Sequence, residues 1–185
     1  MRTVAVLGSG SWGTALAVHL GRLHHDVRLW GRDRALVDEL CARRANAVYL
    51  PDVTLPPSVS VTHDLGEALG GVDLVIAAVP SHGLRAVVRS ASPYAPSRAV
   101  WVSAAKGLES DTMLRMSEVI TEEVGGAVPV VVLSGPSFAI EVARQLPTAV
   151  LAASSSADAT ELVQAEFRGS YFRLRSEERR VRERV

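Results

Sequence analysis

Cysteine and lysine are almost absent from this sequence of 185 residues. The single Cys41 excludes an internal disulfide and any metal site with several cysteine ligands, so a reducing compartment is the simplest expectation. No apolar run reaches the ~18 residues of a membrane span, and the glycine-rich turn at residue 8 comes too early for the core of a signal peptide. We therefore expect a cytoplasmic protein with no integral membrane segment and no metal site.

An excess of charge of either sign is also missing. Twenty basic residues balance 20 acidic ones, which argues against a nucleic-acid-binding protein. Lys106 is the only lysine, and arginine supplies every other basic side chain apart from histidine. Residues 168–185 hold seven arginines beside three glutamates. The segment 175–185 has only two apolar residues, both valines, so we expect a divergent, solvated tail with no packed role.

What the sequence does contain is a regular alternation of two kinds of segment over residues 1–174. Short apolar runs rich in β-branched residues predict strands, and longer amphipathic stretches predict helices. The predicted strands are 3–7, 26–30, 59–61, 72–79, 99–102, 128–133, 148–153 and 171–174. The predicted helices are 14–20, 34–45, 65–69, 84–91, 112–124, 138–144 and 158–167, and residues 50–58, with three prolines, are predicted to form a loop. This order predicts an α/β domain with a mainly parallel sheet.

A glycine-rich turn, Gly8-Ser-Gly-Ser-Trp-Gly13, follows the first predicted strand. Gly8 would allow the tight turn, Gly10 would let the backbone approach a pyrophosphate, and Gly13 would let the helix pack close to the strand. The N-terminus of that helix offers free N–H groups to the phosphates. Because the turn lies between a strand and a helix, we interpret it as a dinucleotide-binding loop rather than as a purely structural turn.

The second predicted strand is followed by Arg32-Asp33-Arg34. An acidic residue at this position usually binds the ribose 2′-OH of NAD, whereas an arginine accommodates the 2′-phosphate of NADP. Arg32 comes first and Arg34 adds a second positive charge, so the pattern favours NADP(H), with NAD(H) possible. The alternative is that these charges are solvated and cap the next helix.

Three more polar segments follow predicted strands, at the edge of the sheet where α/β proteins bind ligands. The segment 79–82 is expected to line the cofactor. His82 is interpreted as a residue at the start of a helix, and the alternative is that it contacts the nicotinamide or acts in proton transfer. Lys106 is placed to polarise a substrate oxygen or to attract an anionic substrate. The segment 134–137 precedes a helix predicted to start at Ser137. It lacks the Gly-x-Ser-x-Gly elbow of a nucleophilic serine, so hydrolysis is poorly supported.

Taken together, several motifs resemble one family, the bacterial NAD(P)-dependent glycerol-3-phosphate dehydrogenases. The resemblance is carried by residues 8–16, 29–32, 46, 50–51, 79–81, 105–109, 134–141 and 146–148. The Lys-Gly-Leu-Glu segment at 106–109 and the Ser-Gly-Pro-Ser-Phe-Ala segment at 134–139 are far more specific than the glycine turn. They discriminate against related dehydrogenases that act on hydroxy acids or sugar nucleotides.

The resemblance implies a Rossmann-like, doubly wound sheet over residues 1–174 that binds NAD(P)H. It implies interconversion of dihydroxyacetone phosphate and sn-glycerol 3-phosphate for glycerophospholipid synthesis, with a homodimer possible in the full-length family. The cofactor contacts expected from the motifs and the resemblance together are Gly8, Gly10, Ser11, Trp12, Gly13, Arg32, Asp33, Lys106 and Ala139. The substrate contacts implied by the resemblance are Lys106, Gly135 and Ser137.

One part of the family's pattern has no counterpart here. The resemblance implies an all-helical second domain that supplies a proton-accepting lysine within a Gly-x-x-Lys-Asn segment. The sequence stops matching after Leu174, and Lys106 is its only lysine. We therefore expect a truncated chain without the family's catalytic residue, which binds cofactor with little turnover. The alternative from another class is a non-catalytic NAD(P)-binding module or regulator.

Overall fold

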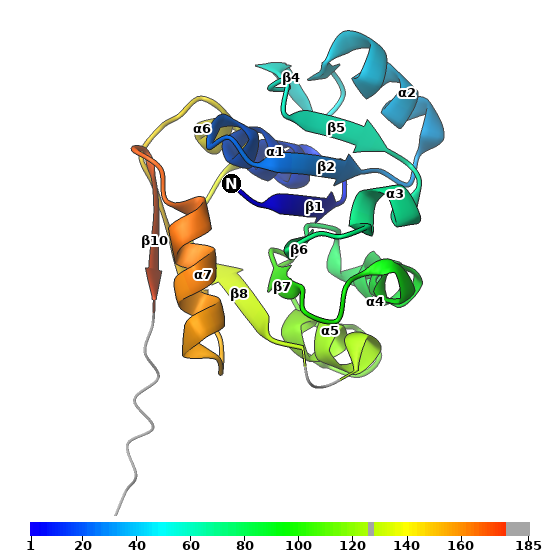
Figure 1. Cartoon of the computed structure of the whole chain (residues 1–185), viewed down its shortest axis with the longest axis vertical. Helices are drawn as coiled ribbons and strands as arrows, with labels where there is room; N and C mark the ends of the chain where they lie inside the picture. The colour runs from blue at the N-terminus through cyan, green and yellow to red at the C-terminus, as the bar shows by residue number, and fades with distance from the viewer. Residues whose placement is uncertain (126–127, 177–185) are drawn as a thin grey trace, which may run out of the picture.

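The computed structural model describes residues 1–125 and 128–176, in which eight strands form one large sheet in the order β10-β9-β8-β7-β6-β1-β2-β5 (Figure 1). These strands are β1 (Thr3–Leu7), β2 (Asp26–Trp30), β5 (Val59–Thr62), β6 (Leu74–Ala77), β7 (Val100–Ser103), β8 (Val130–Ser134), β9 (Thr148–Ala153) and β10 (Phe172–Ser176). Neighbouring strands are parallel except for the pair β8 and β9. The predicted mainly parallel sheet is therefore confirmed.

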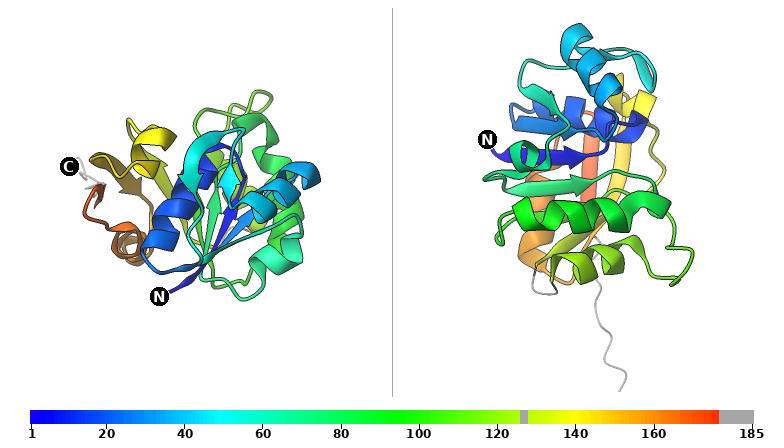
Figure 2. Two further views of the ribbon diagram at one scale, coloured as in Figure 1. Left: turned by 90° about the horizontal axis from the view of Figure 1, so that it is seen from above. Right: turned by 90° about the vertical axis from the view of Figure 1, so that its right-hand side faces the viewer.

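Helices cover both faces of this sheet (Figure 2). One layer contains α1 (Ser11–Arg22), α6 (Ala139–Ala143) and α7 (Ala157–Phe167), and the other contains α3 (Leu65–Leu69), α4 (Ser81–Ala91) and α5 (Met116–Val124). The helix α2 (Arg34–Arg43) follows β2, and a 3-10 turn (Ser92–Tyr94) follows α4. The doubly wound, Rossmann-like architecture is confirmed.

The central strand β1 shows why this architecture forms. Val4 and Val6 pack against the α1 layer, whereas Ala5 and Leu7 pack against the layer of α3, α4 and α5. All four side chains are fully buried. A strand that is buried on both faces needs a continuous apolar run instead of alternation, and residues 3–7 provide one.

The chain changes direction at β1. It builds outward through β2 and β5, and then crosses to β6 on the other side of β1. In such sheets a crevice opens at the carboxyl ends of the two strands at the switch point. Gly8 follows β1 and Ala78 follows β6, and Ala78 N–H donates to the Leu7 carbonyl at 2.9 Å. The glycine turn therefore lies at the switch point.

The predicted loop over residues 50–58 is wrong in its first half. Leu50–Thr54 forms a strand, β4, which pairs antiparallel with β3 (Ala45–Asn46). Leu50 and Val53 are buried in the core beside α1. Asp52 lies between them with φ of +64°, so the strand does not show the period of two that identifies strands in a sequence.

The helix predicted over residues 112–124 starts too early. α5 begins at Met116, because Met113 has φ of +59° and Leu108 pairs with Arg115 to close a turn. Thr112 Oγ1 donates to Glu109 Oε2 at 2.6 Å and so stabilises the turn instead of a helix.

Several other boundaries differ from the sequence prediction. α2 ends at Arg43 rather than at residue 45, because Arg44 has φ of +52°. α4 begins at Ser81 rather than at residue 84, and β6 covers Leu74–Ala77 rather than 72–79.

α1 begins at Ser11 rather than at residue 14, and α6 begins at Ala139 rather than at 137 or 138. β10 continues to Ser176, so the first two residues assigned to the tail belong to the sheet. The rest of the predicted tail, 177–185, lies outside the described residues. Within the described residues, every helix is too short or too polar to cross a bilayer.

A buried histidine joins α1 to the C-terminal end of the sheet. His19 Nε2 donates to the Phe167 carbonyl at 2.8 Å, and Nδ1 lies 2.8 Å from the Tyr171 hydroxyl, which donates to it. The ring also packs against Phe172 at a centroid distance of 4.5 Å. Burial lowers the pKa of His19 from 6.5 to about 4, so the folded protein holds this imidazole neutral.

This pKa predicts that stability falls in mild acid. The unfolded chain binds a proton at His19 near pH 6.5, whereas the folded chain binds it only near pH 4. The free energy of unfolding is therefore unaffected by His19 protonation above pH 6.5 and decreases as the pH falls from 6.5 towards 4. The loss over this window should reach about 3 kcal/mol. Urea unfolding between pH 7.5 and 4.5 measures it, and His19→Gln should flatten the dependence. The exposed His63 provides the control: a His63→Gln slope as flat as that of His19→Gln would refute the assignment.

Candidate functional site

Four segments meet at one edge of the sheet, because they follow four neighbouring parallel strands. They are residues 8–10 after β1, 78–80 after β6, 104–107 after β7 and 135–137 after β8. Parallel strands end at the same edge, so the predicted glycine turn, Lys106 and the Gly135–Ser137 turn are placed along one line. This edge is the candidate site.

Two glycines of the turn are required by the protein itself. Gly8 has φ of +117°, and a Cβ there would lie 2.8 Å from the Ala78 carbonyl oxygen. A Cβ on Gly13 would overlap the Gly8 carbonyl oxygen. These positions permit the sharp turn and the close approach of α1 to β1, as the sequence predicts.

Gly10 is different, because neither packing nor backbone conformation requires a glycine there. Its φ is −73°, and a Cβ would meet no protein atom within 4 Å. Gly10 is also the N-cap of α1, and the first N–H groups of a helix, here those of Ser11, Trp12 and Gly13, have no carbonyl partner within the helix. The open space at Gly10 and these free donors together suit an anionic group that approaches the backbone closely.

Arg32 and Asp33, the two cofactor residues predicted after β2, have different surroundings in the structure. Asp33 Oδ1 accepts from Ala35 N–H at 3.0 Å and from Leu36 N–H at 3.3 Å, so this side chain caps α2. Arg32 is exposed. The capping alternative weighed from the sequence therefore describes Asp33, whereas no such contact is seen for the exposed Arg32 among the described residues.

The two segments that the resemblance assigns to the substrate are in contact. Lys106 Nζ donates to the Gly135 carbonyl at 3.2 Å, and Ser137 Oγ donates to the same oxygen at 3.4 Å. Gly135 has φ of +141°, which favours glycine. Ala139 begins α6 directly after Phe138, whose backbone is extended. Lys106 thus connects the β7 and β8 segments of the site.

His82 lies in the first turn of α4 and is exposed. Within the described residues its side chain makes no hydrogen bond or ion pair with the rest of the site. The structure thus places His82 at the start of a helix. The described residues also contain no cluster of three or more His, Cys, Asp or Glu side chains suited to a metal ion.

An ion-pair cluster that the sequence did not reveal holds the Lys106 segment in place. Arg85 of α4 binds both carboxylate oxygens of Glu109 at 2.7 Å, and its third nitrogen binds Glu123 of α5 at 2.7 Å. The Arg85 hydrogen bonds, with that of Thr112, lower the pKa of Glu109 to about 2. Glu109 is therefore ionised at neutral pH and links the loop after Lys106 to two helices.

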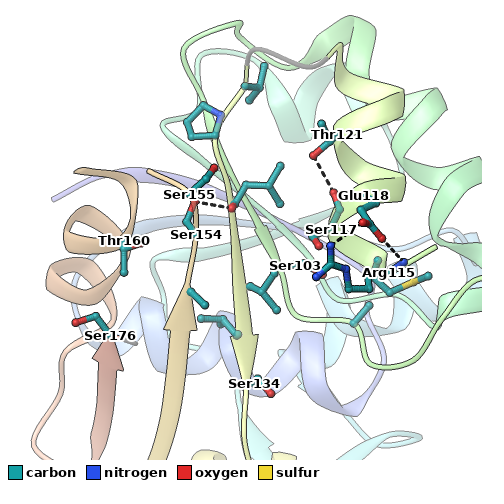
Figure 3. A pocket seen from close by; sticks show the side chains of 18 of the residues that line it. Ser103, Arg115, Ser117, Glu118, Thr121, Ser134, Ser154, Ser155, Thr160 and Ser176 are labelled. Carbon is teal, nitrogen blue, oxygen red and sulfur yellow. Dashed lines mark hydrogen bonds and ion pairs between the residues drawn. The ribbon is translucent and has the colours of Figure 1, made fainter. Parts of the chain in front are cut away.

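A hollow of about 1250 Å³ lies next to this site, over β8 and between α5 and α7 (Figure 3). Lys106 and Gly107 are among the residues that line it. Ser103 lines it, and its buried hydroxyl has no hydrogen-bond partner among the described residues. At the glycine turn itself, the space next to Gly10 is open, because a Cβ there would meet no protein atom within 4 Å.

The strand order and the glycine turn define a Rossmann-like α/β domain. Residues 3–160 match the family model described as the N-terminus of NAD-dependent glycerol-3-phosphate dehydrogenase. The chain belongs to this family.

Individual relatives agree with the family model. The chain is 47% identical over 171 residues to a protein named glycerol-3-phosphate dehydrogenase [NAD(P)+] from Thermoanaerobacter sp. (strain X514), over 92% of this chain and 51% of the relative. It is 43% identical to the protein of the same name from Bacillus pumilus, over 94% and 51%. The crystal structure of glycerol-3-phosphate dehydrogenase from Coxiella burnetii superposes with a TM-score of 0.91 at 36% identity, over 96% of this chain and 54% of that one. The chain thus spans about half the length of the curated relatives that it matches.

Proposed function

We propose that this chain is the cofactor-binding half of a cytoplasmic glycerol-3-phosphate dehydrogenase that interconverts dihydroxyacetone phosphate and sn-glycerol 3-phosphate for glycerophospholipid synthesis. The observation that carries the proposal is the open space at Gly10, on the same strand edge as the contact between Lys106 and Gly135. The relatives' printed name, with the cofactor NAD(P)+, supports the same assignment.

In this proposal each segment of the candidate site binds a different part of the ligands. The N–H groups at the start of α1 bind the pyrophosphate, with Ser11 and Trp12 beside it, and Arg32 binds the 2′-phosphate. Ala139 contacts the cofactor near the β8 segment. Gly135 and Ser137 contact the substrate.

When bound at this edge, the proposed cofactor NADPH would supply a hydride for the ketone carbon of dihydroxyacetone phosphate. The ketone oxygen then needs a proton, and its developing negative charge needs a cation nearby. The Lys106 ammonium is held by the Gly135 carbonyl at 3.2 Å. From there it binds the substrate and stabilises this charge.

The 185-residue chain is expected to turn over slowly by itself. Lys106, the only lysine among these 185 residues, is already assigned to cofactor and substrate contact, so these residues alone supply no second lysine for proton transfer. Loss of a general acid costs about 10²–10⁴-fold in rate. NADPH oxidation with dihydroxyacetone phosphate, measured beside a relative of full length, should show at least this difference. Equal rates would contradict the expectation, and NADPH binding with no turnover at all would favour the non-catalytic module.

Cofactor preference depends on Arg32 in this proposal. Arg32→Glu should lower the ratio of NADPH to NADH affinity by about 10- to 100-fold, because a hydrogen bond to a charged group contributes about 1.5–3 kcal/mol. Arg98→Glu makes the same change of charge at an exposed residue before β7, at the opposite edge of the sheet. If both variants shift the ratio equally, the effect is one of net charge and Arg32 has no specific role.

A further inference from the structure

Asn46 is the only asparagine of the chain, and its side chain is fully buried beside the glycine turn. Its Nδ2 group donates to the Ser9 carbonyl at 2.9 Å and to Thr14 Oγ1 at 2.8 Å. Its Oδ1 accepts from Tyr49 N–H at 3.0 Å. Both amide hydrogens and one oxygen lone pair are therefore used, which fixes the orientation of the side chain.

The hydrogen bond to Ser9 fixes the direction of one peptide group. The Ser9–Gly10 peptide is trans, so its carbonyl and its N–H point in opposite directions. The Ser9 carbonyl points to Asn46, and the Gly10 N–H consequently points away from it. Within the described part of the chain, no backbone carbonyl accepts a hydrogen bond from this N–H.

We propose that Asn46 is a positioning residue of the nucleotide site, which holds the Ser9–Gly10 peptide so that the Gly10 N–H faces the pyrophosphate. The proposal rests on the proposed function, because it needs a dinucleotide at the glycine turn. It assigns no contact between Asn46 and the ligand. Asn46 acts through the backbone of the turn.

The peptide needs such support because of its neighbours. Gly10 and Gly8 flank Ser9, and glycine rotates more freely than any other residue. Without Asn46, the Ser9 carbonyl would keep only the hydrogen bond from Thr14 Oγ1, at 3.4 Å. The peptide could then rotate and carry the Gly10 N–H out of position before a ligand binds.

Three variants separate positioning from general stability. Asn46→Asp has the same shape but presents an oxygen to the Ser9 carbonyl, and Asn46→Ala removes the amide. Ser58→Ala is the matched control, because Ser58 Oγ donates at 2.9 Å to the Gly21 carbonyl at the other end of α1. Asn46→Asp and Asn46→Ala should weaken NADPH binding by about 10- to 100-fold. Ser58→Ala should lower only the melting temperature.

Two further measurements identify the mechanism. Adenosine 2′-monophosphate has no pyrophosphate, so its affinity, measured by NMR titration, should be the same in the Asn46 variants and the wild type. Protonation of Asn46→Asp restores a donor for the Ser9 carbonyl. The ratio of its NADP+ dissociation constant to that of the wild type should therefore decrease as the pH falls from 8 to 5.5.

Two results would overturn the inference while leaving the proposed function standing. One is wild-type affinity for NADPH in both Asn46 variants. The other is an equal loss for NADPH and adenosine 2′-monophosphate, which indicates general unfolding. A wild-type chain that binds no NADPH would overturn the proposed function and this inference with it.

Discussion

Gly10→Glu is expected to weaken NADPH binding by at least about a hundredfold while the protein remains folded. A Cβ at this position would meet no protein atom within 4 Å and φ of Gly10 is −73°, so we expect the fold to accept a side chain here. The same space is the proposed pyrophosphate position, where the carboxylate would both fill the site and repel the phosphates. Two lost charge-assisted hydrogen bonds, each about 1.5–3 kcal/mol, already correspond to this factor.

The measurement pairs an NADPH titration with a thermal melt of the same sample. Ala165→Glu serves as the control, because Ala165 is exposed on α7 and acquires the same charge far from the turn. Gly10→Glu with unchanged NADPH affinity would show that the nucleotide does not bind at this turn.

Gly13→Ala, unlike Gly10→Glu, should lower the stability of the fold. The new methyl group would overlap the Gly8 carbonyl oxygen and lie 3.0 Å from its carbonyl carbon. Since the obstacle is backbone, α1 would have to move away from β1, at a cost of about 3 kcal/mol. For a domain of this size the melting temperature should fall by about 6–12 °C.

Gly83→Ala is the matched comparison for this loss of stability. Gly83 lies in α4, and a Cβ there meets nothing within 4 Å. Alanine is the better helix former, so this variant should gain up to about 1 kcal/mol. Equal stability of Gly13→Ala and Gly83→Ala would contradict the packing described for the turn.

The parts of the fold that depend on local pattern could be predicted from the sequence. The run over residues 3–7 identified a strand buried on both faces, and the glycines after it identified the turn. β4 could not be predicted, because Leu50 and Val53 are buried by α1, a contact that their spacing does not reveal. The start of α5 depends on the turn around Glu109, which is likewise a product of tertiary contacts.

The candidate site could also be predicted only in part. Its strand-end residues were expected together, because parallel strands place them at one edge, and Lys106 does contact Gly135. The roles of Arg85 and Asn46 were not predicted, since each depends on a partner far away in the sequence. Asn46 is one of the residues on which the family resemblance rests. Its role, however, follows only from its hydrogen bonds in the structure.

The central claim is that the edge of the sheet around the glycine turn binds a reduced pyridine nucleotide. Titration of the purified chain with NADPH, followed by tryptophan emission, tests it most directly, because Trp12 lies in the first turn of α1 beside the proposed pyrophosphate position. The account predicts saturable quenching with one NADPH bound per chain, and a rise in melting temperature over the same concentrations. A folded chain that shows neither change with NADPH or with NADH would contradict it.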